Sequence, residues 1–186
     1  EILKKIKELK IINLRKNIGS QRAIAIGLKY ILENSEETEE RMIITMDSDG
    51  QDDPAAINKL IELSQNQRSE IITVDRTRRN EPIWFKVLYE IHYLGLILFS
   101  GRKIRYGNYG LINRNKIKKL LIKGDVWSAY PAAISNNFKE IKKVFSERKK
   151  RFSGNTKMNL YKLIIHSIRV YSVFKYKFLF FSLFYS

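Results

Sequence analysis

Residues 42–54 read Met42-Ile43-Ile44-Thr45-Met46-Asp47-Ser48-Asp49-Gly50-Gln51-Asp52-Asp53-Pro54. A short run of β-forming residues ends abruptly in a cluster of carboxylates, and a proline then opens a new segment. Such a run, too short for a typical helix and without alternation, predicts a fully buried strand. Carboxylates at the carboxyl end of such a strand lie where open α/β sheets bind ligands. Because Asp47 and Asp49 repel each other unless a cation or hydrogen-bond donors offset their charge, we predict a divalent-metal site here.

The composition limits which metal such a site could hold. The chain has 186 residues, no cysteine and two histidines, His92 and His166, so a zinc site of cysteines and histidines is excluded. Oxygen ligands favour magnesium, manganese or calcium. An EF-hand calcium loop is excluded because its sixth and twelfth positions would be Asp52 and Asn58. Both histidines lie in apolar helical patterns, and we expect them to be structural.

The formal net charge of +16 indicates an anionic partner, which could be nucleic acid, lipid headgroups or a phosphorylated substrate. A general excess of lysine, as in an AT-rich genome, accounts for part of this charge. The sequence shows no recognition helix, zinc ligand set or aromatic RNA-binding motif, so we predict that the partner is not nucleic acid. No uninterrupted apolar span reaches 18 residues. The aromatic stretch 170–186 is typical of an interfacial segment or of a membrane helix cut short.

The order of the predicted elements indicates a sheet covered by helices. Strands alternating with helices through short links predict an α/β domain with a mostly parallel sheet. We expect Ser20 to cap the helix that follows it. The predicted helices are 1–10, 21–32, 55–63, 83–99, 117–121, 127–138 and 159–171, and the predicted strands are 11–14, 42–46, 69–74, 102–114 and 140–145.

Basic residues follow several of these elements. A turn with glycine at residues 15–19 opens a helix and offers N–H donors to an anion. Arginines suited to bidentate phosphate binding follow a strand at residues 75–79. A basic loop at residues 148–158 precedes an apolar helix, an arrangement that suits a phosphate at a membrane surface.

The acidic stretch resembles the Asp-x-Asp-x-Gln-Asp signature of family-2 glycosyltransferases, and most closely that of the dolichyl- and undecaprenyl-phosphate sugar transferases. The resemblance implies a GT-A (Rossmann-like) fold with C-terminal amphipathic, membrane-proximal helices. It also implies a partial catalytic domain over residues 1–157 and an amphipathic segment over residues 158–186. The segments that carry the resemblance are residues 15–28, 42–54, 74–86, 106–114 and 148–174.

The resemblance implies roles for particular residues. Asp47, Asp49 and Gln51 would hold Mg²⁺ or Mn²⁺ against the diphosphate of a nucleotide sugar. The nucleotide and its diphosphate would be bound by Arg15, Asn17, Gly19 and Asp47. The acceptor or its phosphate would be bound by Arg76, Arg78, Arg79, Lys86, Asn108, Arg148, Arg151 and Lys157. The sequence departs from the pattern at Gly110, where several polyprenyl-phosphate enzymes carry an arginine.

The implied reaction is inverting hexosyl transfer from a nucleotide sugar to a polyprenyl phosphate, at the cytoplasmic face of a membrane, for cell-envelope glycan synthesis. A phosphate acceptor is largely ionised at neutral pH, because its second pKa is about 6, and needs no strong base. A sugar hydroxyl acceptor would need a carboxylate base. The sequence does not identify a catalytic residue, and neither Asp52 nor Asp53 is assigned that role.

The family's usual first strand and its Asp-Asp-Gly-Ser motif are not found before residue 15, so we expect an N-terminally truncated enzyme. Two alternatives stay open. One is a non-catalytic remnant that binds anionic membranes through its basic, aromatic C-terminal half, and the other is a family-2 transferase acting on a sugar hydroxyl. A homo-oligomer is compatible with each of them.

Overall fold

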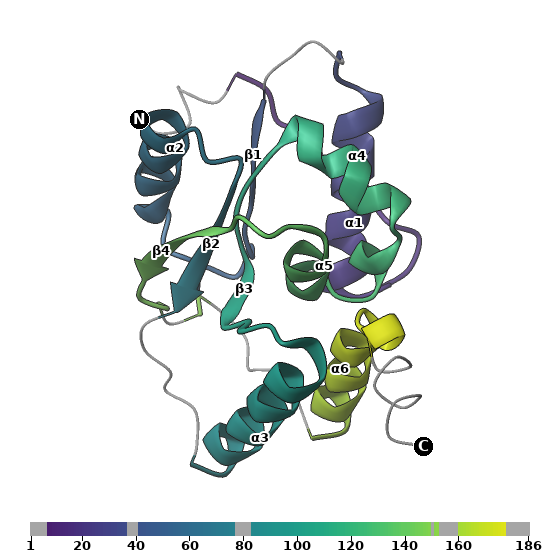
Figure 1. The fold of residues 1–186 in the computed structure, drawn as a ribbon. Helices are drawn as coiled ribbons and strands as arrows, with labels where there is room; N and C mark the ends of the chain where they lie inside the picture. Colours follow the sequence, from purple (N-terminus) through teal and green to yellow (C-terminus); the bar gives the residue numbers. More distant parts are fainter. Residues whose placement is uncertain (1–6, 37–40, 77–82, 150, 153–159, 178–186) are drawn as a thin grey trace.

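The computed structural model describes residues 7–36, 41–76, 83–149, 151–152 and 160–177 (Figure 1). Within these residues four strands form one sheet in the order β1-β3-β2-β4. Strands β2 and β4 are parallel, and β3 runs antiparallel to both β1 and β2. The carboxyl ends of β1, β2 and β4 therefore meet at one edge of the sheet. The strands are β1 (Met42–Thr45), β2 (Ile71–Arg76), β3 (Tyr106–Asn113) and β4 (Lys142–Ser146).

Helices cover both faces of this sheet, which confirms the predicted α/β class. One face carries α2, and the other carries α1, α4 and α5, while α3 and α6 pack against each other at one end of the sheet (Figure 1). The helices are α1 (Ser20–Glu33), α2 (Ala56–Gln67), α3 (Ile83–Ser100), α4 (Arg114–Ile122), α5 (Tyr130–Asn137) and α6 (Leu160–Ser172), with a short 3₁₀ turn, η2, at Asp125–Trp127.

The core follows the two-residue repeat of the strands, because successive side chains point to opposite faces of a sheet. Ile71 of β2 packs with Leu28 of α1 and Ile117 of α4 on one face. Ile72, the next residue, packs with Leu60 of α2 on the other face. Sheet and helices thus form two apolar layers that hold the strand ends in place.

The predicted helices at 21–32, 55–63, 83–99 and 159–171 are confirmed within a few residues. The predicted strand at 11–14 is wrong: these residues form no regular element, and their apolar side chains are exposed. For the predicted helix at 1–10, residues 1–6 lie outside the described part, and residues 7–10 are not helical.

Two finer expectations are also corrected. Ser20 is the first residue of α1 rather than its cap, and Gly19 occupies the cap position. Strand β1 is not fully buried, because it lies at an edge of the described sheet and Met42 is 42% exposed. Among the described residues, no helix is both long enough and apolar enough to cross a membrane.

Candidate active site

The acidic turn, residues 47–53, leaves the carboxyl end of β1 and folds back on itself. The Asp47 N–H donates to the Asp52 carboxylate at 2.9 Å, and the Gln51 N–H donates to Oδ1 of Asp49 at 3.0 Å. The Tyr109 hydroxyl donates to the Asp53 carbonyl oxygen at 2.9 Å. Asp52 is only 5% exposed, so its carboxylate shapes the turn rather than facing a ligand.

A basic strap, defined by Arg148, Lys149, Arg151 and Phe152, lies directly against the acidic turn. The Lys149 N–H donates to the Gln51 carbonyl oxygen at 2.9 Å, and the Phe152 N–H donates to the Asp49 carbonyl oxygen at 3.1 Å. Two segments that are distant in the sequence are therefore joined by their backbones. The described residues of the predicted basic loop, 148, 149, 151 and 152, lie beside the carboxylates.

The side chains of the strap neutralise the turn. Arg151 pairs with Oδ2 of Asp49 at 3.0 Å. Arg148 and Arg151 both donate to the Gln51 side-chain oxygen, at 2.6 and 3.2 Å. Two of the three residues predicted to hold a metal, Asp49 and Gln51, thus already contact arginines, so the arginines of the strap and the oxygens of the turn form one site.

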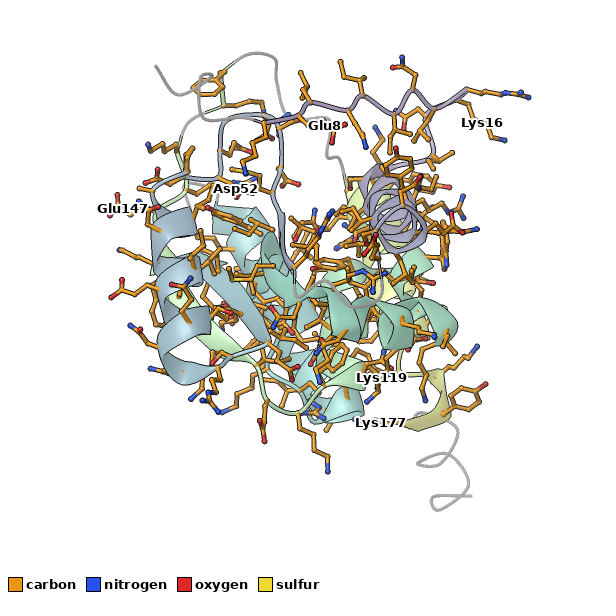
Figure 2. The ribbon with its side chains drawn as sticks, turned by 90° about the horizontal axis from the view of Figure 1, so that it is seen from above. Glu8, Lys16, Asp52, Lys119, Glu147 and Lys177 are labelled. Atoms are coloured by element: carbon orange, nitrogen blue, oxygen red, sulfur yellow. The ribbon has the colours of Figure 1, made fainter. Side chains whose placement is uncertain are left out.

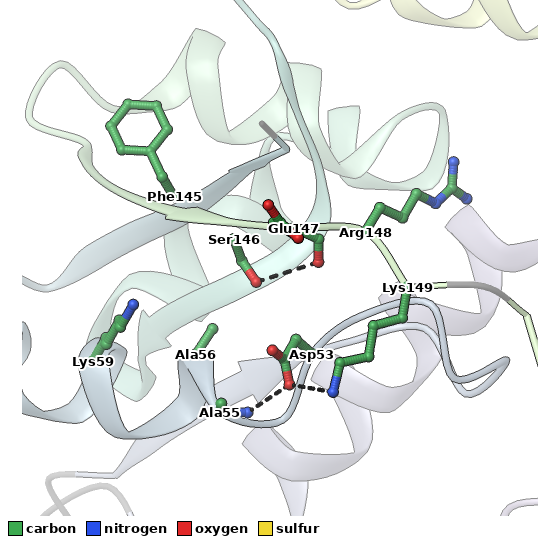
Figure 3. Close-up of a pocket in the computed structure, with 9 residues that line it drawn as sticks. All are labelled: Asp53, Ala55, Ala56, Lys59, Phe145, Ser146, Glu147, Arg148 and Lys149. Carbon is green, nitrogen blue, oxygen red and sulfur yellow. Dashed lines mark hydrogen bonds and ion pairs between the residues drawn. The ribbon is translucent and has the colours of Figure 1, made fainter. Parts of the chain in front are cut away.

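Asp53 and Lys149 extend this pairing to the outer side of the turn. The Ala55 N–H, with the Lys149 ammonium at 3.0 Å as the next contribution, holds the pKa of Asp53 below its ordinary value. Figure 3 shows Lys149 reaching toward Asp53, while Arg148 points the other way. These residues border a pocket of about 680 Å³, which is also lined by Lys59 of α2 and Phe145 of β4.

Asn108 of β3 lies at the centre of a chain of hydrogen bonds that reaches Asp47. Its side-chain N–H donates to Oδ1 of Asp47 at 3.1 Å, and its side-chain oxygen accepts from Gln21 of α1 at 2.9 Å. The Gln21 oxygen in turn accepts the Tyr130 N–H at 2.7 Å. Nothing in the sequence pattern singles out Gln21, because 87 positions separate it from Asn108.

Gly110, where the sequence departs from the expected arginine, has a packing role. Thr45 of β1 and Thr73 of β2 both lie opposite it in the sheet. A β-carbon at Gly110 would lie 2.5 Å from the Ile72 carbonyl oxygen, so the strands approach too closely here for a larger residue.

The turn at residues 15–19 is built as expected but lies apart from the acidic turn. Oδ1 of Asn17 accepts the Gly19 N–H at 3.0 Å, and Gly19 has a φ of 84°. Arg15 is exposed, and a pocket of about 390 Å³ is lined by residues on both sides of it in the sequence, Ile12 and Leu14 before it and residues 16–20 after it. Figure 2 shows Lys16 well to the side of Asp52 and Glu147. The structure therefore does not bring Arg15, Asn17 and Gly19 into contact with the carboxylates.

The other residues predicted to bind the acceptor are more scattered. Arg76 ends β2, at the same sheet edge as the acidic turn, and Lys86 is exposed on α3. Arg78, Arg79 and Lys157 lie outside the described residues. Of the predicted acceptor residues, Asn108, Arg148 and Arg151 are thus the ones seen to contact the acidic turn.

The oxygens of the acidic turn suit a divalent metal only in part. Within the described residues, no group of three or more aspartate, glutamate or histidine side chains could hold a metal ion by itself. Asp47, Asp49 and Gln51 nevertheless offer hard oxygen donors on one short turn. Magnesium is commonly bound by one or two carboxylates together with substrate phosphates. The donor set therefore fits a metal that is shared with a phosphorylated ligand.

The fold and this site together define an α/β protein of the GT-A type. The family model described as glycosyl transferase family 2 matches residues 1–145, and the chain belongs to that family. A curated protein of Synechocystis sp. (strain ATCC 27184 / PCC 6803 / Kazusa), named an uncharacterized glycosyltransferase, is 28% identical over 169 residues. The aligned part is 84% of this chain and 48% of that protein, so the chain spans about half the length of the relative. No solved structure gave a significant match.

Proposed function

We propose that the chain carries the acceptor-side and metal-binding half of an inverting hexosyltransferase, which moves a sugar from a nucleotide sugar to a polyprenyl phosphate at the cytoplasmic face of a membrane. Membership of family 2 supports sugar transfer between a nucleotide-sugar donor and an acceptor. The observation that carries the proposal further is the acidic turn held against the basic strap by Arg151–Asp49 and Arg148–Gln51 contacts.

In this proposal the acidic turn binds the metal and the basic strap binds phosphate. Asp47, Asp49 and Gln51 would hold Mg²⁺ or Mn²⁺, which would offset the charge of the departing diphosphate. Arg148 and Arg151 have planar guanidinium groups that bind phosphate oxygens in bidentate fashion. The acceptor oxygen forms a bond to the anomeric carbon as the bond from that carbon to the nucleoside diphosphate breaks. A phosphate acceptor makes this step possible without a general base.

The membrane location is supported by two exposed apolar stripes. Val87, Ile91, Leu94 and Leu98 lie at helical spacing on α3, and all four are more than half exposed. Tyr161, Ile164 and Ile168 form a similar stripe on α6. The two helices contact each other, and the Tyr171 hydroxyl donates to the His92 carbonyl oxygen at 3.0 Å. Apolar stripes with a strong positive charge suit an anionic lipid surface.

Metal-dependent nucleotide binding tests the enzymatic proposal. Calorimetry with UDP and with GDP, each with and without Mn²⁺, should show binding that disappears when EDTA removes the metal. Asp49→Ala should weaken this binding at least about tenfold, which corresponds to about 1.4 kcal/mol. Glu62→Ala removes a carboxylate from the exposed side of α2 and serves as the control. Binding that ignores both EDTA and Asp49→Ala would count against the proposal.

The apolar stripes favour a second candidate, a membrane-binding protein without transferase activity. In that case the chain would sediment with anionic vesicles and yet transfer no sugar from any nucleotide sugar offered to it. The calorimetric result separates the two candidates, since a protein that only binds membranes needs neither the metal nor Asp49.

A further inference from the structure

Four groups from different parts of the chain are joined in one line of hydrogen bonds. The line runs from the Tyr130 N–H at the start of α5, through the side chains of Gln21 and Asn108, to the carboxylate of Asp47, with distances of 2.7, 2.9 and 3.1 Å. It connects the first turn of α1, the first turn of α5, the inner strand β3 and the acidic turn that follows β1. Asn108 and Gln21 are both partly buried.

The two ends of this line determine the orientation of both amides. A backbone N–H can only donate, so the Gln21 oxygen must face Tyr130 and the Gln21 nitrogen must face Asn108. The Asn108 oxygen then accepts from Gln21, which leaves the Asn108 nitrogen to donate to Asp47. An ionised carboxylate can only accept, so the polarity is consistent along the whole line.

The backbone of Asn108 is held separately. The Thr45 hydroxyl donates to the Asn108 carbonyl oxygen, and the adjacent strand pairing places Gly110 opposite Thr45. With the backbone held in this way, the orientation of the Asn108 amide depends on the contacts of its side chain. Two contacts favour the observed orientation: Asp47 accepts from the Asn108 nitrogen, and Gln21 donates to the Asn108 oxygen.

We propose that Gln21 is a positioning residue, which acts through Asn108 to keep a hydrogen-bond donor on Asp47 and so holds that carboxylate in the orientation needed to bind a metal–diphosphate group. The proposal rests on the proposed function for the role of Asp47. The geometry of the line itself does not depend on that function.

The variant Gln21→Glu separates positioning from stability. Glutamate still accepts the Tyr130 N–H, and its negative charge at the start of α5 is favourable, because helix N-termini carry partial positive charge. Its second oxygen cannot donate to Asn108, which must therefore turn its nitrogen toward Glu and its oxygen toward Asp47. We expect unchanged or higher thermal stability together with a weakened site, whereas a purely structural role would leave the site intact.

Two further variants control for charge. Gln21→Met is uncharged and of similar length, and it removes both hydrogen bonds. Gln65→Glu makes the same charge change on the exposed side of α2. Affinity for UDP and for GDP in the presence of Mn²⁺ should fall about tenfold in Gln21→Glu, fall by a smaller factor in Gln21→Met, and stay unchanged in Gln65→Glu.

The side-chain amide signal of Asn108 is the second readout, measured by NMR without metal or nucleotide. In the original chain, one proton of this amide should exchange slowly with water and show a coupling to the Asp47 carboxyl carbon. Both features should disappear in Gln21→Glu and weaken in Gln21→Met, where Asn108 loses the contact that anchors its oxygen. Failure of the original chain to bind either nucleotide with Mn²⁺ would overturn the proposed function, and the amide signal would still decide whether Gln21 orients Asn108. An amide signal that is the same in all variants, or one that changes with no loss of affinity, would overturn the positioning role.

Discussion

Gly50 shows how a single residue allows the strap to lie on the acidic turn. Its φ of 80° is a left-handed conformation that side chains disfavour, and a β-carbon there would overlap the Phe152 ring. Phe152 is 86% exposed, so its ring lies against Gly50 on the solvent side of the turn. The glycine therefore provides both the bend of the turn and the close contact with the strap.

Gly50→Ala should lower the free energy of unfolding by about 1–2 kcal/mol, because the left-handed conformation becomes strained. Urea denaturation measures this change. Gly27→Ala is the matched control: it lies within α1 with nothing within 4 Å of the new β-carbon, and it should raise the stability by about 0.5–1 kcal/mol. Equal effects of the two substitutions would contradict this account of Gly50.

Particular residues show why only part of the site could be predicted from the sequence. Asp47, Asp49 and Gln51 stand together on one turn, so their grouping is visible in the sequence and the structure keeps it. The roles predicted for these residues and for the basic residues around them stay predictions. Gln21 could not be predicted, because its contacts depend on how α1, β3 and α5 pack together.

The strap is the element that balances the acidic turn. Arg151 and Asp49 are both partly exposed, with 32% and 26% of their side chains accessible, so their pairing is screened by water and weak enough to be exchanged. A cation held by Asp49 would have to compete with the Arg151 guanidinium for the same oxygen.

Arg151→Gln should therefore increase the affinity for Mn²⁺ alone by about two- to fivefold, the range expected for an exposed ion pair of up to about 1 kcal/mol. Electron paramagnetic resonance of free Mn²⁺ measures this affinity without nucleotide. Arg68→Gln, at the exposed end of α2, removes the same charge far from the turn and should have little effect. A lower affinity in Arg151→Gln would show that the arginine does not compete with the metal.

The helices α3 and α6 meet around a pair of histidines. Burial lowers the pKa of His92, with nearby His166 as the second cause, and burial followed by Arg169 lowers the pKa of His166. Nδ1 of His92 is buried without a hydrogen-bond partner, and its ring lies edge-on to Tyr171 at 5.3 Å. Burial thus disfavours the protonated form of both rings.

Acid should loosen this helix pair. In the unfolded chain the histidines titrate near a pKa of about 6.5, so below that pH the unfolded state binds protons that the folded state resists. The contribution of the neutral histidines to the free energy of unfolding is complete above about pH 6.5 and is lost as the pH falls below that value. Thermal unfolding followed by circular dichroism should show a midpoint that drops between about pH 7.5 and pH 5.5. The double variant His92→Gln/His166→Gln should make the unfolding midpoint less dependent on pH. If its pH dependence stays the same, groups other than these histidines are responsible.

At the scale of the whole molecule, the fold class and most helices were predicted correctly, because apolar spacing and turn residues are local signals. The strand order was not predicted, since β3 enters between β1 and β2 through pairings such as Ile44 with Leu111 and Ile72 with Leu111. The strand predicted at residues 11–14 is wrong because the prediction relied on local propensity alone. Those residues have strong β propensity, but within the described part of the chain they have no strand to pair with.

The net charge of +16 and the apolar stripe on α3 act together in the proposed membrane binding. Ile91→Glu and Leu94→Glu should each reduce sedimentation with vesicles of phosphatidylcholine and phosphatidylglycerol about fivefold, because each loses about 1 kcal/mol of apolar burial. Both side chains are exposed, so stability should change by less than about 0.5 kcal/mol.

Ile122→Glu is the matched control, since Ile122 is 76% exposed on α4, away from the stripe. It should sediment like the original chain. Equal losses in all three variants would show that general charge, rather than the α3 stripe, governs the association with vesicles.

The insertion of β3 between β1 and β2 has a consequence for the order in which the molecule is made. Met42 pairs with Asn113, so β1 cannot complete its pairing with β3 until the ribosome has synthesised residue 113. At typical translation rates this is roughly 4–14 s after the synthesis of residue 42. The strap follows later still. A nascent chain halted before residue 148 would contain the residues of the four described strands, and its acidic turn would lack the arginines that complete the site.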